Sequence, residues 1–228
     1  MAEQKSPHDV PDVTGMSIGI LGGTGDQGRG LARRFAIAGH WVLIGSRDAE
    51  RARAAAAELG SRLPVRGMEN AAVAAEADVV VVAVPWEGHR ELLASLAGPL
   101  AGKIVIDCVN PLGFDKQGPF ALPVPEGSAA QQAAAVLPDS RVVGAFHHVS
   151  SVLLLDPEVD RVDLDVLVLG DDREATDTVR ALAGRIPGFR GVYGGRLRNA
   201  HQVEALTANL IAVNRRYKAH AGLRITDV

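Results

Sequence analysis

The sequence of 228 residues has one cysteine, few aromatic residues and no excess of positive charge. The lone Cys108 cannot form an internal disulfide, so we expect a reducing compartment, the cytoplasm. A formal net charge of −3 gives no basic field that would attract nucleic acid or an anionic membrane. No apolar run reaches the roughly 20 residues that a membrane span needs. We therefore expect no nucleic acid and no membrane as partners.

Residues 1–15 mix prolines with charged residues and lack the apolar stretch of a signal peptide. We expect them to form a flexible N-terminal tail outside the fold. Hydrophobic residues make up 47% of the whole sequence, which is enough for a sizeable core. Its length and a change of rhythm after residue 150 predict a larger domain at 16–150 and a small C-terminal domain at 151–228.

Short apolar runs alternate with helical stretches from residue 16 onwards. Continuous apolar runs are typical of strands covered on both faces, and they predict parallel strands at residues 16–21, 41–44, 79–84, 104–108 and 142–146. The stretches between them predict helices at 28–38, 48–59, 71–77 and 87–97. Gly39, Gly60 and Gly98 follow these stretches and suit C-terminal caps. The pattern predicts an α/β fold with a Rossmann-type doubly wound parallel sheet.

The second half of the chain is less regular. Residues 110–127 hold four prolines and three glycines, which predicts a long irregular loop, either a functional cover or a surface excursion. Ser128 and Gln131 form a capping-box pattern that predicts a helix over 128–136. A strand at 163–169, a helix at 171–184, a strand at 189–193 and a helix at 197–221 would form a small C-terminal α+β domain. The last helix has an apolar stripe that could pack on the main domain or on a second subunit: Val203, Leu206, Leu210, Val213 and Tyr217.

The most informative motif is Gly22-Gly23-Thr24-Gly25-Asp26-Gln27-Gly28. It contains G-x-G-x-x-G directly after a predicted strand and before a predicted helix, which is the context of a dinucleotide-binding turn. Glycines at Gly23, Gly25 and Gly28 permit the tight turn and let backbone amides approach a pyrophosphate at the helix N-terminus. The alternative is a glycine-rich turn that only joins strand to helix. We favour the binding function.

The end of the second predicted strand distinguishes between nicotinamide cofactors. NAD-binding chains usually place an acidic residue there, whereas this chain has Ser46 and Arg47, with Arg51 one helical turn further. A guanidinium offers a planar fork of donors to the 2′-phosphate of NADP. The alternative is that both arginines are solvated surface charges. We expect NADP(H).

Further loops follow the third, fourth and fifth predicted strands, at the edge where ligands bind in open α/β sheets. They contain Val84-Pro85-Trp86, Asn110-Pro111 and His147-His148-Val149-Ser150-Ser151, and we expect them to meet at the nicotinamide. Trp86 could form a flat wall for a ring or be a packing residue. The adjacent histidines diverge in direction and have no third ligand at a recognisable spacing, so we expect no metal site. Cys108 is expected to be an inert, buried thiol.

The sequence motifs together resemble those of the F420-dependent NADP reductases, which are NADPH:coenzyme F420 oxidoreductases. The likeness rests on Leu21-Gly22-Gly23-Thr24-Gly25, Gly45-Ser46-Arg47 and Val84-Pro85-Trp86-Glu87, and it extends from residue 16 to the end of the chain. It implies reversible hydride transfer between NADP(H) and coenzyme F420, both small-molecule coenzymes, and a homodimer. It also implies that Thr24–Gln27 hold the pyrophosphate and that Ser46, Arg47 and Arg51 hold the 2′-phosphate. Val84, Trp86, His147 and Leu206 would border the cleft between the domains.

The likeness has two departures. Arg51 stands where the family suggests lysine, and the loop at 147–151 is more polar than in archaeal members. No catalytic residue is assigned with certainty, and His147 is a candidate for lining the cleft. Hydride transfer between two planar rings needs orientation and exclusion of water more than a protein acid.

Three alternatives remain open from the sequence. An NADP-dependent dehydrogenase or imine reductase would normally have a larger helical second domain with a catalytic lysine, whereas Lys218 is the one lysine of the last predicted helix and lies near its end. A non-enzymatic NADP sensor would lack a pocket for a second ligand. A ferric reductase resembles this domain as well but needs a membrane haem portion.

Overall fold

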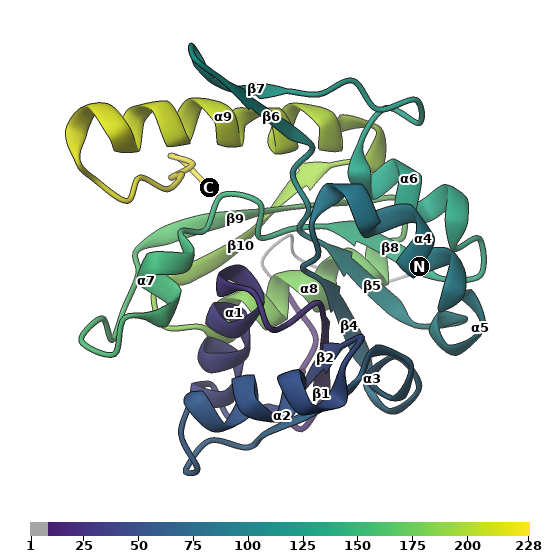
Figure 1. The fold of residues 1–228 in the computed structure, drawn as a ribbon. Helices are drawn as coiled ribbons and strands as arrows, with labels where there is room; N and C mark the ends of the chain where they lie inside the picture. Colours follow the sequence, from purple (N-terminus) through teal and green to yellow (C-terminus); the bar gives the residue numbers. More distant parts are fainter. Residues whose placement is uncertain (1–8) are drawn as a thin grey trace, which may run out of the picture.

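A computed structural model describes residues 9–228. Its main feature is an eight-stranded sheet with helices on both faces, and a two-stranded hairpin lies beyond the last helix (Figure 1). The strand order in the large sheet is β10-β9-β8-β5-β4-β1-β2-β3. Neighbouring strands are parallel except at the β8 and β9 pair, which is antiparallel. The Rossmann-type α/β class is therefore confirmed.

The element bounds place most strands and helices where the sequence predicts them. The strands are β1 Ser17–Leu21, β2 Trp41–Ser46, β3 Val65–Glu69, β4 Val79–Val82, β5 Ile104–Asp107, β6 Leu112–Asp115, β7 Gly118–Ala121, β8 Arg141–Gly144, β9 Leu164–Gly170 and β10 Phe189–Gly195. The α-helices are α1 Asp26–Ile37, α2 Ala49–Glu58, α3 Asn70–Glu76, α4 His89–Ser95, α5 Ala97–Leu100, α6 Ala129–Val136, α7 Ser151–Leu155, α8 Arg173–Arg185 and α9 Ala200–Tyr217. Two short 3-10 helices are η1 Trp86–Gly88 and η2 Leu197–Asn199.

Alternation along the parallel strands divides the core into two layers. Ile18 and Ile20 of β1 pack with Phe35 of α1 in one cluster, which also includes residues of α2, α7 and α8. Leu21 belongs to the second cluster, on the other face, with residues of α3, α4 and α6. Every residue of β4 is buried. Continuous apolar strands therefore indicate correctly that both faces of the sheet are covered.

The structure corrects two predictions about strands. The expected irregular loop at 110–127 contains the antiparallel hairpin β6–β7, which turns at Lys116 and Gln117 and continues through Gly118 at φ 121°. The hairpin was not predicted because this segment contains prolines, and proline is depleted in strands. Strand β3 was missed because Val65–Glu69 has a glycine and two charged residues and no apolar alternation. As an edge strand it needs only one strand partner.

Other local predictions have mixed outcomes. Gly39 and Gly60 adopt the positive φ of C-terminal caps, at 94° and 99°, and the Ser128 hydroxyl accepts a hydrogen bond from the Gln131 amide at 3.0 Å. Gly98 lies inside α5, so its predicted cap is wrong. Helix α7 was not predicted. Of the expected tail, residues 1–8 lie outside the described residues, and Val13 is buried in the core, so the packed part of the chain begins before residue 16.

Residues 151–228 contribute to the same sheet and to the layer beside it. Strands β9 and β10 extend the large sheet beyond β8, whereas α9 lies across the carboxyl edge of the strands with the hairpin on its outer side (Figure 1). The division of the chain into two domains at residue 150 stays a prediction.

Buried polar contacts hold α9 in place. The Glu204 carboxylate accepts hydrogen bonds from the backbone amides of Ala129 at 2.9 Å and Ala130 at 3.1 Å, at the N-terminus of α6. The backbone carbonyl of Val203 contacts Nε2 of His148 at 2.6 Å. A carboxylate that satisfies two otherwise unpaired amides is a strong anchor. Glu204 therefore fixes α9 against the body of the protein.

Burial of Glu204 predicts a pH dependence of stability. Burial raises the pKa of Glu204 from 4.5 to about 7, although the bonds from Ala129 and Ala130 oppose the change. The folded protein then binds this proton more tightly than the unfolded chain, so the stabilisation by protonation is present below about pH 4.5 and is lost as the pH rises through about 7. Relative to Glu204→Gln, the free energy of unfolding of the wild type should fall by roughly 1–3 kcal/mol between about pH 5 and pH 8.

Urea denaturation at the two pH values measures this difference. The exposed Glu76 gives a matched control, Glu76→Gln, which keeps Glu204 and whose free energy of unfolding should therefore fall with pH in parallel with that of the wild type. A difference between wild type and Glu204→Gln that is constant with pH would contradict the buried, proton-binding carboxyl.

Candidate functional site

A cleft of about 1080 Å³ lies at the carboxyl ends of the parallel strands and beneath α9. Loops after β1, β2, β4, β5 and β8 line one side, and α9 and the following turn line the other. Of the predicted site residues, the lining includes Thr24, Gly25, Asp26, Gln27, Ser46, Arg47, Arg51, Val84, Pro85, Trp86, Asn110, His147 and Ser151. Gly23, Gly28, Pro111 and Leu206 are outside the lining.

The glycine turn brings α1 unusually close to the sheet. A Cβ on Gly28 would lie 2.6 Å from the Cα of Gly23, so any side chain there would force α1 away. Gly22 has φ 66°, and a Cβ there would lie 2.5 Å from a side-chain carbon of Val84. Gly23 and Gly28 thus shape the turn from behind, while Thr24 to Gln27 face the cleft. The N-cap of α1, Gly25, has no side chain to occupy the free amides.

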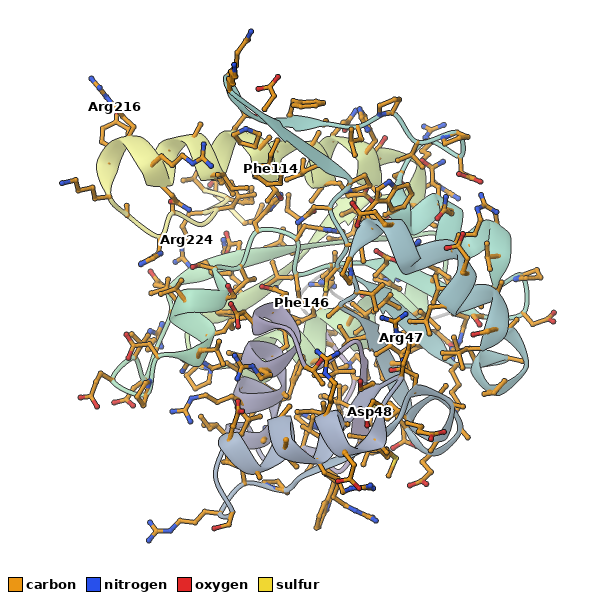
Figure 2. The ribbon with its side chains drawn as sticks, viewed as in Figure 1. Arg47, Asp48, Phe114, Phe146, Arg216 and Arg224 are labelled. Carbon is orange, nitrogen blue, oxygen red and sulfur yellow. The ribbon has the colours of Figure 1, made fainter. Side chains whose placement is uncertain are left out.

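The end of β2 presents two arginines to the cleft. Ser46 is buried, and its hydroxyl accepts a hydrogen bond from the Asp48 amide at 3.2 Å. The Asp48 carboxylate caps α2 by accepting from the amides of Glu50 and Arg51. Arg47 and Asp48 follow β2 beside α2 (Figure 2). Arg47 and Arg51 line the cleft, are exposed and have no ion pair within residues 9–228. Because the nearby acid is used as a helix cap, these guanidiniums are available to an anionic ligand.

Asn70 belongs to the cleft and was missed from the sequence. Its Oδ1 accepts a hydrogen bond from the Gly22 amide at 3.4 Å, and a Cβ on Gly45 would lie 2.5 Å from the same oxygen. Asn70 thus connects the glycine turn with the end of β2. Asn70 directly follows β3. Because this strand was not predicted, Asn70 was not recognised as a residue at the carboxyl end of a strand.

The loops after β5 and β8 are joined by a pair of side chains. Asn110 Nδ2 donates to the His147 carbonyl at 3.1 Å, and its Oδ1 lies 3.2 Å from His147 Nδ1. Since Oδ1 can only accept, His147 Nδ1 carries the proton. Burial lowers the pKa of His147 to about 4. His147 is therefore neutral near pH 7 and is a poor proton donor to a ligand.

His148 and Cys108 are also held by the protein itself. His148 points to α9 through its bond to the Val203 carbonyl, and burial lowers its pKa. The Cys108 thiol donates to the Val82 carbonyl at 3.1 Å, and burial raises its pKa, as does the charge of Asp107. Within the described chain there is no group of three His, Cys, Asp or Glu residues that could hold a metal ion.

Helix α9 forms the wall opposite the strand loops. Thr207, Leu210, Ile211 and Asn214 line the cleft, so the predicted contact at Leu206 is displaced by one residue along the helix. Thr207 Oγ1 donates to the His147 carbonyl at 3.1 Å and ties this wall to the loop after β8. Apolar side chains on both walls, such as Trp86 and Leu210, suit a flat ring system.

The segment at Ser150 and Ser151 is fixed from α1. The buried guanidinium of Arg34 donates to the carbonyls of Leu154 at 2.9 Å and Val159 at 2.6 Å, and also to that of Leu153. These carbonyls belong to α7 and the turn after it. The arrangement holds α7 against α1, so that the two serines stay at the cleft.

Comparison with known proteins identifies related chains. The family model described as NADP oxidoreductase coenzyme F420-dependent matches residues 17–111. The F420-dependent NADP reductase of Methanothermobacter thermautotrophicus is 42% identical over 223 residues, covering 93% of this chain and 96% of the relative. That of Methanocaldococcus jannaschii is 40% identical over 224 residues, covering 93% and 99%.

One solved structure is also similar to this chain. A crystal structure of a protein from Arthrobacter sp. FB24, given as an F420-dependent NADP reductase, has a TM-score of 0.78 and 31% sequence identity, covering 93% of this chain and 100% of that one. No helix in the described part of this chain is long and apolar enough to cross a membrane. The identity and the near-complete coverage on both sides show that the chain belongs to the F420-dependent NADP oxidoreductase family.

Proposed function

We propose that the protein transfers a hydride between NADP(H) and coenzyme F420, and that the cleft under α9 binds both. The observation that carries this proposal is the 42% identity to an F420-dependent NADP reductase over 93% of the chain. The cleft supports it, because a glycine turn with unpaired arginines occupies one end and two apolar walls occupy the other. When bound, NADPH supplies a hydride from its nicotinamide ring and the deazaflavin accepts it.

Each part of the cleft has a place in this proposal. Thr24, Gly25, Asp26 and Gln27 would hold the pyrophosphate region, with Gly23 and Gly28 allowing its approach. Ser46, Arg47 and Arg51 would hold the 2′-phosphate. Pro85, Trp86, Asn110 and Ser151 would border the nicotinamide and exclude water, with Val84, Pro111 and Leu206 supporting these walls. We propose His147 as a lining residue with no acid–base role.

The scarcity of proton donors in the cleft distinguishes this reaction from carbonyl or imine reduction. Those reactions need a protein acid beside the reacting carbon. The titratable side chains of the loops after β5 and β8 that line the cleft are Cys108, His147 and His148. Burial lowers the pKa of His147 to about 4, lowers that of His148 and raises that of Cys108. None of the three supplies a proton readily near pH 7. Hydride transfer to a deazaflavin also consumes one proton, but water can supply it to a ring nitrogen away from the reacting carbon. No protein acid is then needed at that carbon, and orientation makes the main contribution.

The direct test is a mixture of the purified protein, NADPH and oxidised F420, followed through deazaflavin absorbance. We expect loss of the oxidised deazaflavin signal and little reaction when NADH replaces NADPH. Cyclic imines and 3-oxoacids, which accept a hydride from NADPH, serve as competing substrates. Absence of F420 reduction, or faster turnover of an imine, would reject the proposed function.

The arginines determine the choice of cofactor in this proposal. A charge-assisted bond is worth roughly 1.5–3 kcal/mol, so Arg47→Gln should weaken NADPH binding by about 10–100-fold and leave NADH binding nearly unchanged. Isothermal titration calorimetry measures both affinities. Arg53→Gln is the matched control, because Arg53 is on the same helix as Arg51 and pairs with Glu50 outside the cleft. Equal losses for NADPH and NADH would contradict the assignment.

We also propose a cytoplasmic homodimer in which residues 16–150 bind NADP(H) and residues 151–228 close the cleft and contribute to the dimer. The support is a group of exposed apolar side chains on the hairpin and α9: Phe114, Phe120, Val213 and Tyr217. Phe114 lies on the hairpin, on the outer side of α9 (Figure 2). Exposed apolar groups of this kind are typical of subunit contacts.

Light scattering after gel filtration tests the dimer. We expect twice the monomer mass for the wild type and the monomer mass for a Phe114→Ser, Tyr217→Ser double variant. Trp41 is 59% exposed on β2, and Trp41→Ser serves as a control that should stay dimeric. A monomeric wild type at micromolar concentration would reject the dimer.

A further inference from the structure

A buried hydrogen-bonded chain lies directly behind the cleft. His89 Nε2 is 2.6 Å from Asp107 Oδ2, and His89 Nδ1 is 3.0 Å from Gln132 Oε1. The side chains of His89 and Asp107 are both 0% exposed. None of these three residues lines the cleft. The hydride transfer described above makes no use of them.

The orientation of Gln132 is fixed by a further contact. Its Nε2 donates to the Glu126 carboxylate at 3.2 Å. The amide oxygen must therefore be the atom that faces His89, and it can only accept a hydrogen bond. Arg90 pairs with the other oxygen of Glu126, so this carboxylate is held as an acceptor from two sides.

Both ring nitrogens of His89 therefore face acceptors. A neutral imidazole has one N–H and would leave one of the two buried contacts without a proton. An imidazolium satisfies both contacts and pairs with the Asp107 carboxylate. The direction of the pKa agrees: burial lowers the pKa of His89, but the charge and hydrogen bond of Asp107, with smaller contributions from Gln132 and Glu204, raise it overall.

Two neighbouring loops of the cleft wall contact this pair. The His89 ring lies against Trp86 with centroids 5.5 Å apart and an interplanar angle of 34°, which is within the range for a cation on an indole face. Asp107 Oδ1 accepts a hydrogen bond from the Val109 amide at 3.0 Å. That contact shapes the turn from Cys108 to Asn110, which lines the cleft, and Asn110 in turn holds His147.

A buried ion pair usually adds little to the free energy of unfolding. Well-packed apolar residues of similar volume are often as stabilising, because two charges must be taken out of water. Perturbed ionisable groups next to a cleft are more often related to function. Here His89 contacts Trp86 and Asp107 holds the Cys108–Asn110 turn, so the pair sets the relative position of two neighbouring loops of the same wall.

We infer that His89 is an imidazolium paired with Asp107, and that this pair is a positioning device that holds Trp86 and the Cys108–Asn110 turn for hydride transfer. The inference rests on the proposed function for its catalytic consequence. Its structural part, the protonation of His89, stands on the hydrogen-bond geometry. The charged groups that face His89 are Asp107 from β5 and Glu204 from α9, with Glu126 and Arg90 beyond Gln132.

The first experiment tests the charge on His89 without any activity. The protein has seven histidines, so ¹⁵N-histidine labelling gives a countable spectrum, and His89→Gln identifies the His89 signals by their loss. We expect two protonated ring nitrogens on His89 in the wild type near pH 7.5. In Asp107→Asn we expect the neutral form. A neutral His89 in the wild type would overturn the inference.

The second experiment tests positioning. A misplaced wall should lower the single-turnover rate constant for hydride transfer by about 10–100-fold in Asp107→Asn, because small displacements of reacting groups are costly. The dissociation constant for NADPH should stay within about twofold, since the phosphate contacts are intact. Gln132→Met removes one acceptor and keeps the pair, so its loss of rate should be smaller. His201→Gln, at an exposed site on α9, is the matched control.

The outcomes separate this inference from the proposed function. If the wild type does not transfer a hydride between NADPH and F420, the proposed function fails, and the NMR result still decides the charge on His89. If the wild type is active and Asp107→Asn folds and keeps its full rate, the positioning role is rejected. If Asp107→Asn does not fold, the rate of His89→Gln decides, because this variant removes the imidazolium beside Trp86 and the ion pair with it. An unchanged rate in that variant rejects the role.

Discussion

The whole cleft depends on the close approach of α1 to the carboxyl edge of the sheet. A Cβ on Gly28 would lie 2.6 Å from the Cα of Gly23, which leaves no room for any other residue. This contact aims the first amides of α1 into the space where the strand loops meet. Asn70 and Val84 close on the same turn from two sides. A helix displaced by one side chain would lose the dinucleotide end of the cleft.

The second half of the cleft is set by how α9 is held. Glu204 binds the N-terminus of α6, His148 binds the carbonyl of Val203, and Thr207 binds that of His147. These contacts join the last helix to residues 129–148 in the middle of the chain. Thr207 uses its hydroxyl in this way, and Leu210 and Ile211 give the inner wall an apolar surface. Such a wall suits a planar carrier and excludes water.

The sequence predicts the parts of the site whose chemistry is local. The glycine turn and the arginines after β2 are short motifs in a strand–helix context, and their physical requirements can be read without a structure. The hairpin, β3 and Asn70 could not be predicted, because their places are decided by tertiary contacts that override weak local preferences. The buried pair of His89 and Asp107 joins residues 18 positions apart, and a further partner, Gln132, is 43 positions from His89. No spacing pattern points to such a chain. The shift from Leu206 to Thr207 and Leu210 shows that a helix face is predictable, but its rotation against a cleft is set by packing.

The central claim is that one cleft brings NADPH and F420 together for direct hydride transfer. The most direct measurement uses NADPH carrying deuterium at both C4 positions, with oxidised F420 in ordinary water, and mass analysis of the reduced deazaflavin. Direct transfer predicts one deuterium retained in the product. Reduced deazaflavin without deuterium on carbon, whose new C–H hydrogen therefore comes from the solvent, would contradict the account.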